Sequence, residues 1–293
     1  MHKDESMRRT VYKERESQSR QREAWPTLAR LEFRPKAAQT KTCALKMFSN
    51  KRLPPRDIVS HEREGLQERL AKRCPKEDLL LLDFWVSPFC MRVKIALAEK
   101  GLNYESKEED LFGGKSELLL KSNPVYQKVP VLLHNGKPLN ESAIIVGYID
   151  EKWPSPPLLP ACAYGRSQAR FWADYIDKKL FDATCTVWRS TGEAVEVAKK
   201  DFIEVLKVLE EALGEKKFFG GKTFGFVDIV AIPMASWFYA SEKFGNFTVE
   251  AECPKLSAWI KRSMQRESVA KALPDPEKVY DFVVMFRKMQ GIE

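Results

Sequence analysis

Ser87 stands where a short apolar run meets the start of a helical pattern, in the tetrapeptide Ser87-Pro88-Phe89-Cys90. At such a junction free backbone N–H groups and the positive end of the helix dipole converge, so an anion is stabilised there. An ordinary N-cap serine also accounts for Ser87. A dithiol redox site of the thioredoxin type has cysteine at both ends of the tetrapeptide, so serine at its first position argues against that chemistry.

A second candidate binding segment, Lys128-Val129-Pro130-Val131, leads into an apolar strand. A cis peptide bond before Pro130 would turn the N–H and C=O of the preceding residue outward, where an extended peptide can pair with them. A trans proline at the first residue of a strand explains the same residues. The sequence leaves both interpretations open.

The pair Glu141-Ser142 opens a third helical pattern. Favourable capping chemistry explains both residues without any ligand. In a binding site, the carboxylate would suit a ligand ammonium, and the hydroxyl with the helix N–H groups would suit a ligand carboxylate.

Other catalytic chemistries find little support. The chain has three histidines, and His134, beside an Asn-Gly turn, is the one outside the N-terminal quarter, so no histidine-based triad is expected. Gly114-Lys115-Ser116 and Gly221-Lys222-Thr223 end like a phosphate-binding loop but lack its earlier glycine. The scattered cysteines predict a reduced cytoplasmic protein without a zinc or other metal site: Cys43, Cys74, Cys90, Cys162, Cys185 and Cys253.

Two domains must position these residues. Residues 77–153 predict an α/β domain in the order βαβαββα, because short apolar runs alternate with helical periodicity. Its expected elements are a strand at 79–84, a helix at 88–100, a strand at 103–109, a helix at 116–122, a hairpin at 129–140 and a helix at 141–153.

A proline-rich linker, 154–164, follows, and residues 165–293 predict an all-helical domain. The expected helices cover 166–189, 193–213, 227–240, 254–265 and 275–290. No internal repeat is visible.

The net charge of +8 comes from the N-terminal quarter. Residues 1–76 hold 20 Lys and Arg against 10 Asp and Glu, whereas residues 77–293 hold 29 against 31. The basic segment is poor in large apolar residues and predicts disorder. The acidic residues of this segment argue against a transit peptide, whereas its arginines leave organelle targeting open. Residues 77–293 are slightly acidic, which argues against nucleic-acid binding. The sequence contains no window of about 18 consecutive apolar residues, so it predicts no membrane-spanning helix.

Several stretches together resemble the plant tau-class glutathione S-transferases, over residues 79 to 293. They are LLLLDFWVSPF, KVPVLLHNGKP, NESAIIVGYIDEKWPSPPLLP, ARFWADYIDKK, FFGG and SWFYASEKFGNF. The resemblance implies a thioredoxin-like domain followed by an all-α domain, in a homodimer. It also implies conjugation of reduced glutathione, a co-substrate, to hydrophobic electrophiles in detoxification, with no prosthetic group.

The resemblance also implies roles for individual residues. Ser87 would be the catalytic serine, and Glu141 with Ser142 would hold the γ-glutamyl end of glutathione. Lys128, Val129 and a cis Pro130 would also bind glutathione, with the backbone of Val129 pairing with the peptide. Lys115 or Lys128 would meet the glycyl carboxylate, and Lys115 lies in a loop one residue longer than usual. The electrophile would contact aromatic side chains, for which we select Phe89, Phe171, Trp172, Tyr175 and Trp188.

The sequence departs from the family pattern at two places. Cys90 follows Ser-Pro-Phe, where the tau class has other residues, and it is either a packed helix cysteine or a thiol near the site. Gly225-Phe226-Val227-Asp228 replaces a Ser/Thr-x-x-Asp helix cap, and Asp228 can still reach back to the N–H of Gly225. Besides transferase activity, with or without glutathione peroxidase activity, two alternatives stay open: a ligandin-like carrier of hydrophobic or glutathione-tagged metabolites, and a thiol transferase that uses Cys90.

Overall fold

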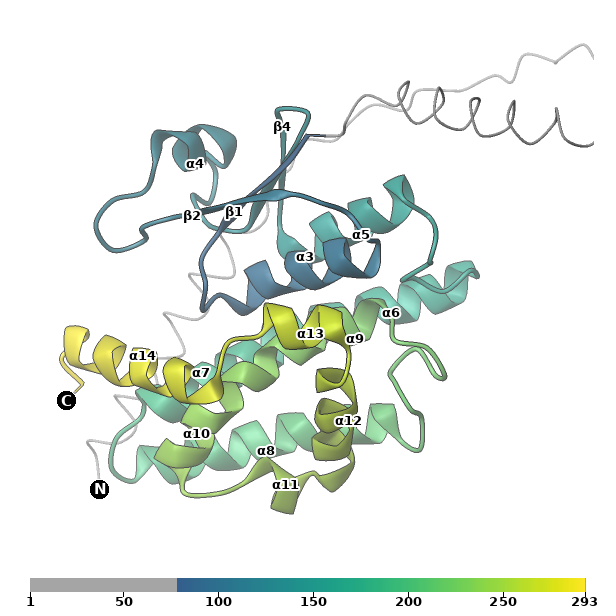
Figure 1. Cartoon of the computed structure of the whole chain (residues 1–293). Coiled ribbons are helices and arrows are strands. Elements are labelled where there is room, and N and C mark those ends of the chain that lie inside the picture. The colour runs from purple at the N-terminus through teal and green to yellow at the C-terminus, as the bar shows by residue number, and fades with distance from the viewer. Residues whose placement is uncertain (1–77, 293) are drawn as a thin grey trace, which may run out of the picture. The chain divides into compact units, whose positions relative to one another are not determined.

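The computed structural model describes residues 78–292, which form a thioredoxin-like domain and a helical domain (Figure 1). The expectation of disorder for residues 1–76 lies outside the described residues. Among the helices of residues 78–292, none is long and apolar enough to cross a membrane.

The first domain contains a four-stranded sheet in the order β2-β1-β3-β4. Strand β1 pairs in parallel with β2 and antiparallel with β3, and β3 pairs antiparallel with β4. The predicted order βαβαββα is confirmed by β1 (Leu79–Asp83), α3 (Pro88–Glu99), β2 (Glu105–Glu108), α4 (Glu117–Ser122), β3 (Val131–His134), β4 (Lys137–Asn140) and α5 (Ser142–Lys152).

Strand β1 is apolar on both faces because both faces are covered. Leu81 packs with α3 and α5 in the main core, whereas Leu82 packs on the opposite face with Leu119 and Val131. Both leucines are fully buried, so the run of leucines is explained by a strand between two layers.

The β3–β4 hairpin turns at Asn135-Gly136, where both residues have positive φ, +50° and +74°. This conformation is that of the two-residue type I′ turn, for which Asn-Gly is strongly preferred. The Asn135 side chain also accepts a hydrogen bond from the N–H of Asp78 at 3.0 Å.

The proline-rich linker is held in place by Asp150 near the end of α5. Its carboxylate accepts hydrogen bonds from the N–H groups of Leu158 (2.7 Å) and Leu159 (3.0 Å), and it pairs with Lys100 at 2.6 Å. The Ser155–Pro156 peptide bond in this segment is cis.

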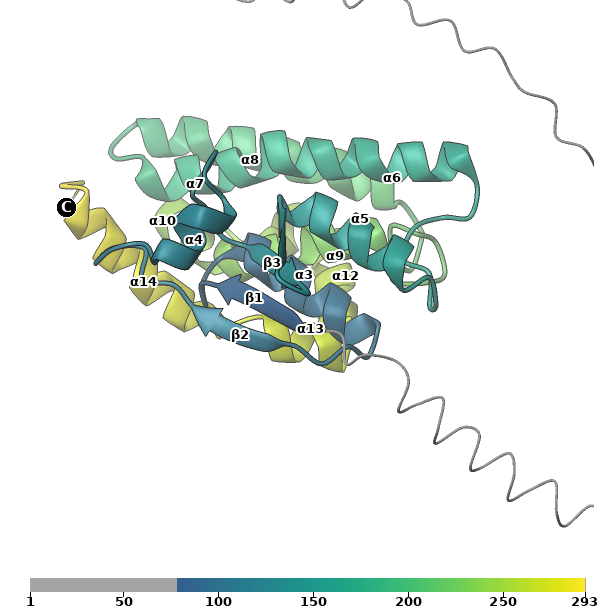
Figure 2. The ribbon, with the colours of Figure 1, turned by 90° about the horizontal axis from the view of Figure 1, so that it is seen from above.

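The second domain is helical, as predicted. Its elements are α6 (Ala163–Tyr175), a π-helical segment (Ile176–Leu180), α7 (Phe181–Arg189), α8 (Ala194–Leu213), α9 (Phe226–Ala231), a 3₁₀ segment (Ile232–Trp237), α10 (Phe238–Gly245), α11 (Val249–Glu252), α12 (Pro254–Met264), α13 (Glu267–Ala272) and α14 (Pro276–Met289). Helix α7 packs beside the long α8 (Figure 2).

Two helix predictions need correction. The helix expected at 166–189 begins at Ala163 and contains the π-helical segment, which a search for α-helical periodicity does not detect. The helix expected at 227–240 is divided by the 3₁₀ segment, because Pro233 lacks the N–H that an uninterrupted α-helix needs. The short helices α11 and α13 were not predicted.

Helix α3 joins the two domains, since it contacts α5 on one side and α9, α13 and the 3₁₀ segment on the other. At its end, Glu99 forms an ion pair with Arg266 at 2.6 Å. At its start, the indole N–H of Trp237 donates to the carbonyl of Val86 at 3.1 Å. The domains are therefore fixed to each other at both ends of the helix that Ser87 caps.

Candidate active site

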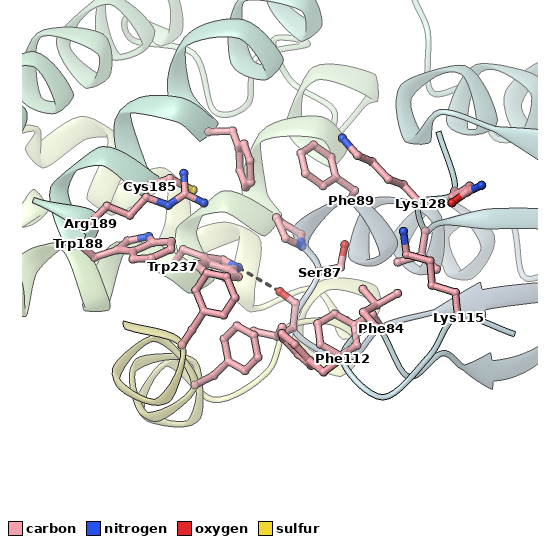
Figure 3. Close-up of a pocket in the computed structure, with 18 residues that line it drawn as sticks. Phe84, Ser87, Phe89, Phe112, Lys115, Lys128, Cys185, Trp188, Arg189 and Trp237 are labelled. Atoms are coloured by element: carbon pink, nitrogen blue, oxygen red, sulfur yellow. Dashed lines mark hydrogen bonds between the residues drawn. The ribbon is translucent and has the colours of Figure 1, made fainter. Parts of the chain in front are cut away.

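The side chain of Ser87 lies at the N-cap of α3, half-buried and at the edge of a pocket (Figure 3). Pro88 occupies the first helical turn, where its missing N–H costs nothing. The hydroxyl oxygen of Ser87 accepts a hydrogen bond from the N–H of Cys90 at 3.3 Å. Its own O–H is therefore available as a donor toward the pocket.

The pocket has a volume of about 320 Å³ and lies between the two domains. The thioredoxin-like domain supplies Ser87, Phe89, Lys115, Lys128 and Val129 of the predicted residues. The helical domain supplies Trp188. The structure thus brings six of the predicted residues to one cavity, and the first and last of them, Ser87 and Trp188, are 101 positions apart in the chain.

The Val129–Pro130 peptide bond is cis, which decides between the two interpretations that the sequence left open. Pro130 itself is buried, directly before β3. Gln127, which also lines the pocket, has a φ of +52°. This turn places the backbone of Val129 at the pocket wall.

Glu141 and Ser142 begin α5, and they do not line the cavity itself. Glu141 is exposed and takes a φ of +69° as the N-cap. Ser142 is 6% exposed, and its Oγ accepts a hydrogen bond from Arg92 Nη1 at 3.0 Å. Its hydroxyl proton is not used in that bond and can be donated to another acceptor.

Arg92, which sequence reasoning missed, is completely buried beneath this part of the site. It donates to the carbonyl of Val230 at 2.9 Å and forms an ion pair with Asp177 at 2.7 Å, so it links Ser142 to the helical domain. Burial lowers the pKa of its guanidinium, and the charge of Asp177 opposes that effect. The guanidinium also lies 4.9 Å from the ring centroid of Phe89.

The structure places Phe171, Trp172 and Tyr175 outside this pocket. They lie on α6, where Phe171 is 55% exposed and the other two pack against the core. The pocket instead uses the C-terminal half of the long helix, at Phe181, Cys185, Trp188 and Arg189. The helical pattern alone does not show which half of that helix faces Ser87.

Sequence reasoning also missed six aromatic residues of the pocket. They are Phe84, Phe112, Phe181, Trp237, Phe282 and Phe286. Apart from Phe181, whose ring contacts Phe89 at 4.9 Å, their rings contact one another, for example Phe84 with Phe282 at 6.0 Å, and Phe282 stacks on Phe286. Phe282 and Phe286 are four positions apart on α14, a spacing that places both rings on one face of a helix, so the sequence could have indicated this pair.

Cys90 is completely buried. Burial, and then the charge of Asp83, raises the pKa of its thiol to about 12. Cys90 is therefore packed as a small apolar residue and is protonated at neutral pH.

Comparison with known proteins agrees with this geometry. Residues 77–151 match the family model of the glutathione S-transferase N-terminal domain, and residues 192–262 match that of the C-terminal domain. The probable glutathione S-transferase parC of Nicotiana tabacum is 61% identical over 219 residues, which are 74% of this chain and 99% of that protein. Glutathione S-transferase U19 of Arabidopsis thaliana is 59% identical over 72% of this chain and 96% of its own length.

The chain belongs to the glutathione S-transferase family. A crystal structure of rice GST1 in complex with glutathione is 50% identical, with a TM-score of 0.72, and the match covers 74% of this chain and 99% of that one. The tau-class glutathione S-transferase of mango, Mangifera indica, is 41% identical with a TM-score of 0.68, over 71% of this chain and 98% of that one. The predicted resemblance to the tau class is thereby confirmed.

Proposed function

We propose that this protein is a glutathione transferase that joins the thiolate of reduced glutathione to hydrophobic electrophiles, with Ser87 as the donor that stabilises the thiolate. The observation that carries the proposal is the hydroxyl of Ser87 at the start of α3, which lines a pocket between the domains and accepts the N–H of Cys90, so that its O–H can donate to a ligand. Family membership and the glutathione complex of the rice relative support it.

The chemistry requires a thiolate, because the thiol of glutathione is a weak nucleophile. A thiol with a pKa of about 8.5 is only a few per cent ionised near neutral pH. A hydrogen bond from Ser87 and the positive end of α3 both favour the ionised form. A pKa shift of about two units corresponds to about 2.7 kcal/mol.

The remaining groups of glutathione have partners of matching chemistry in and beside the pocket. Lys115 or Lys128 suits the glycyl carboxylate, and the backbone of Val129 suits the peptide backbone of the cysteinyl residue. Glu141 suits the α-ammonium, and Ser142 with the start of α5 suits the α-carboxylate. The electrophile would occupy the aromatic side of the cavity, between Phe89, Trp188 and α14.

The substitution Ser87→Ala tests the role of the serine. With 1-chloro-2,4-dinitrobenzene at pH 6.5, we expect kcat/KM to fall about 100-fold and the pH profile of kcat/KM to move about two units upward. Thr248→Ala is a matched control, because Thr248 caps α11 through an N–H···O bond of the same 3.3 Å length. An unchanged pH profile in Ser87→Ala would contradict the mechanism.

A carrier without useful turnover is the second candidate function, because the pocket is mostly aromatic and aliphatic. Binding of glutathione and of its thioether conjugates, measured by quenching of tryptophan fluorescence, distinguishes the two. Binding without turnover of any aryl halide would favour the carrier.

We also propose that two copies of the chain associate through the groove between α5 and α6, which has a volume of about 480 Å³. Ile144 lines this groove and is 65% exposed, and Arg170, Glu151 and Asp174 add both signs of charge to the same lining. Ile144→Asp should convert the dimer to a monomer in size-exclusion chromatography with light scattering.

Residence in the cytoplasm is likewise a proposal, to be tested by imaging the full chain fused to a fluorescent protein.

A further inference from the structure

The charged side chains that line the pocket are all positive. They are Lys115, Lys128 and Arg189, and no carboxylate of residues 78–292 joins them in the lining. The remaining wall is mostly apolar, whereas all three cations are exposed to solvent, so an incoming anion can reach them. The pocket as a whole is therefore built for a ligand with negative charge.

The three cations lie on two opposite sides of the pocket. In the view of Figure 3, Lys115 and Lys128 lie on the thioredoxin-like side and Arg189 lies on the helical side, with Ser87 between them. The proposed function already uses a lysine for the glycyl carboxylate of glutathione. Arg189 faces the region left for the electrophile, beside Cys185 and Trp188.

An arginine in the last turn of a helix can act simply by neutralising the helix dipole. Here Arg287 already serves the end of α7. It is 3% exposed, donates to the carbonyl of Trp188 and lies 3.4 Å from that of Ser190. Capping α7 therefore does not require Arg189.

Arg189 is held in place without being neutralised. Its guanidinium lies over the Trp188 ring, 4.7 Å from the centroid, and it makes no ion pair with any carboxylate in the described part of the chain. Stacking on an indole leaves the N–H groups at the edge of the guanidinium free to donate. Its charge also reaches the pocket wall, since it opposes the rise that burial causes in the pKa of Cys185.

We propose that Arg189 binds a carboxylate on the electrophile, so that this protein prefers flat aromatic electrophiles whose carboxylate lies at the end remote from the reacting carbon. This inference rests on the proposed function and names its substrate class. A planar guanidinium can donate two parallel hydrogen bonds to a carboxylate, which gives direction as well as affinity. The surrounding aromatic rings would hold the ring of the electrophile.

The reaction leaves the carboxylate unchanged. With 4-chloro-3,5-dinitrobenzoate, the glutathione thiolate forms a C–S bond at the carbon that carries chlorine, and the C–Cl bond breaks to release chloride. The proton of the glutathione thiol goes to solvent. Arg189 touches none of the reacting atoms and is a specificity-determining residue.

The test compares 4-chloro-3,5-dinitrobenzoate with its neutral methyl ester. Each kcat/KM is divided by the uncatalysed rate constant with glutathione at the same pH, because the two probes differ in intrinsic reactivity. In Arg189→Met, which removes the charge and keeps an unbranched stem, we expect the carboxylate-to-ester ratio to fall about tenfold, mainly through KM. Arg189→Lys should keep the ratio within about threefold. Lys200→Met is the matched control, since Lys200 is exposed on α8 away from the pocket, and it should leave the ratio unchanged.

The ester rate reports folding of each variant, so a misfolded protein is recognised by loss of both activities. An unchanged ratio in Arg189→Met would overturn the inference, as would a ratio that falls in Lys128→Met and not in Arg189→Met. The Kd values of the two thioether products, from tryptophan fluorescence, give the same comparison without turnover. The two proposals can also fail separately. If the wild-type protein binds the carboxylate product more tightly than the ester product, loses that preference in Arg189→Met and conjugates neither probe, the proposed function is wrong and this inference stands.

Discussion

Ser142 accepts a hydrogen bond from Arg92 at 3.0 Å, and both side chains are buried where the two domains meet. The same guanidinium reaches Val230 and Asp177 of the helical domain. The position of a proposed glutathione-binding hydroxyl is thus tied to how the domains pack.

Replacing Arg92 by lysine should affect binding and stability together. Lysine keeps the positive charge but cannot reach three partners with one planar group. We expect the KM for glutathione to rise about tenfold, with kcat changed less, and the free energy of unfolding in urea to fall by about 1–3 kcal/mol. An unchanged KM in a destabilised variant would show that Arg92 supports the fold alone.

Gly225 caps α9 where a serine or threonine would ordinarily be preferred, and its surroundings explain why. A Cβ at this position would lie 2.8 Å from the carbonyl oxygen of Leu158, which itself accepts a hydrogen bond from the N–H of Phe226. The N–H of Gly225 donates to Asp228 at 3.0 Å, as expected from the sequence. The glycine lets the linker pass close to the start of the helix.

Gly225→Ser should therefore destabilise the protein, although serine is the better isolated N-cap. We expect a loss of about 1–3 kcal/mol in the free energy of unfolding, because the linker must move away. Asp275→Ser is the control, since Asp275 caps α14 with a side chain already in place, and the exchange should cost only a few tenths of a kcal/mol. Equal effects in the two variants would contradict this explanation.

The sequence predicted the half of the site that is built from local signals. A leucine run, Ser87 at an N-cap and Pro88 in the first turn are neighbours along the chain, so their pattern alone gives a strand, a turn and a helix. The Asn135-Gly136 hairpin was predicted for the same reason.

The far wall of the pocket could not be predicted in this way. Trp237 reaches the start of α3 through a hydrogen bond to Val86, a residue 151 positions earlier. Which half of the long helix faces the pocket depends on the π-helical segment and on the pairing of Asp177 with Arg92, neither of which leaves a periodic signal. Phe171 was therefore selected where Phe181 lines the pocket.

The four cysteines that the structure describes should differ strongly in reactivity. Burial raises the pKa of the Cys90 and Cys185 thiols to about 12, whereas Cys162 is exposed. With iodoacetamide at pH 7.5, we expect Cys162 to be modified at least about 100-fold faster than Cys90 in the native protein. Peptide mapping by mass spectrometry distinguishes the sites. Rapid labelling of Cys90, or a disulfide-reducing activity lost in Cys90→Ser, would restore the thiol-transferase alternative.

The same two thiols predict a loss of stability in alkaline solution. Their pKa is about 12 in the folded protein and near the ordinary value of 9.0 in the unfolded chain, which therefore releases protons first as the pH rises. The stabilisation is complete below about pH 9 and is lost progressively between about pH 9 and 12. Urea unfolding at pH 7.5, 9 and 10 should show a falling free energy, with a shallower slope in Cys185→Ala, measured relative to its own value at pH 7.5.

Removal of residues 1–76 should leave glutathione conjugation intact. The residues that line the pocket lie between Phe84 and Phe286, within the part of the chain that the family relatives match. We expect kcat/KM with 1-chloro-2,4-dinitrobenzene to stay within about twofold of the full chain, because no residue proposed to bind glutathione or the electrophile is removed. The full chain assayed in the same buffer is the control. A loss of more than about tenfold, in a truncated protein whose urea unfolding is unchanged, would mean that the basic segment takes part in catalysis.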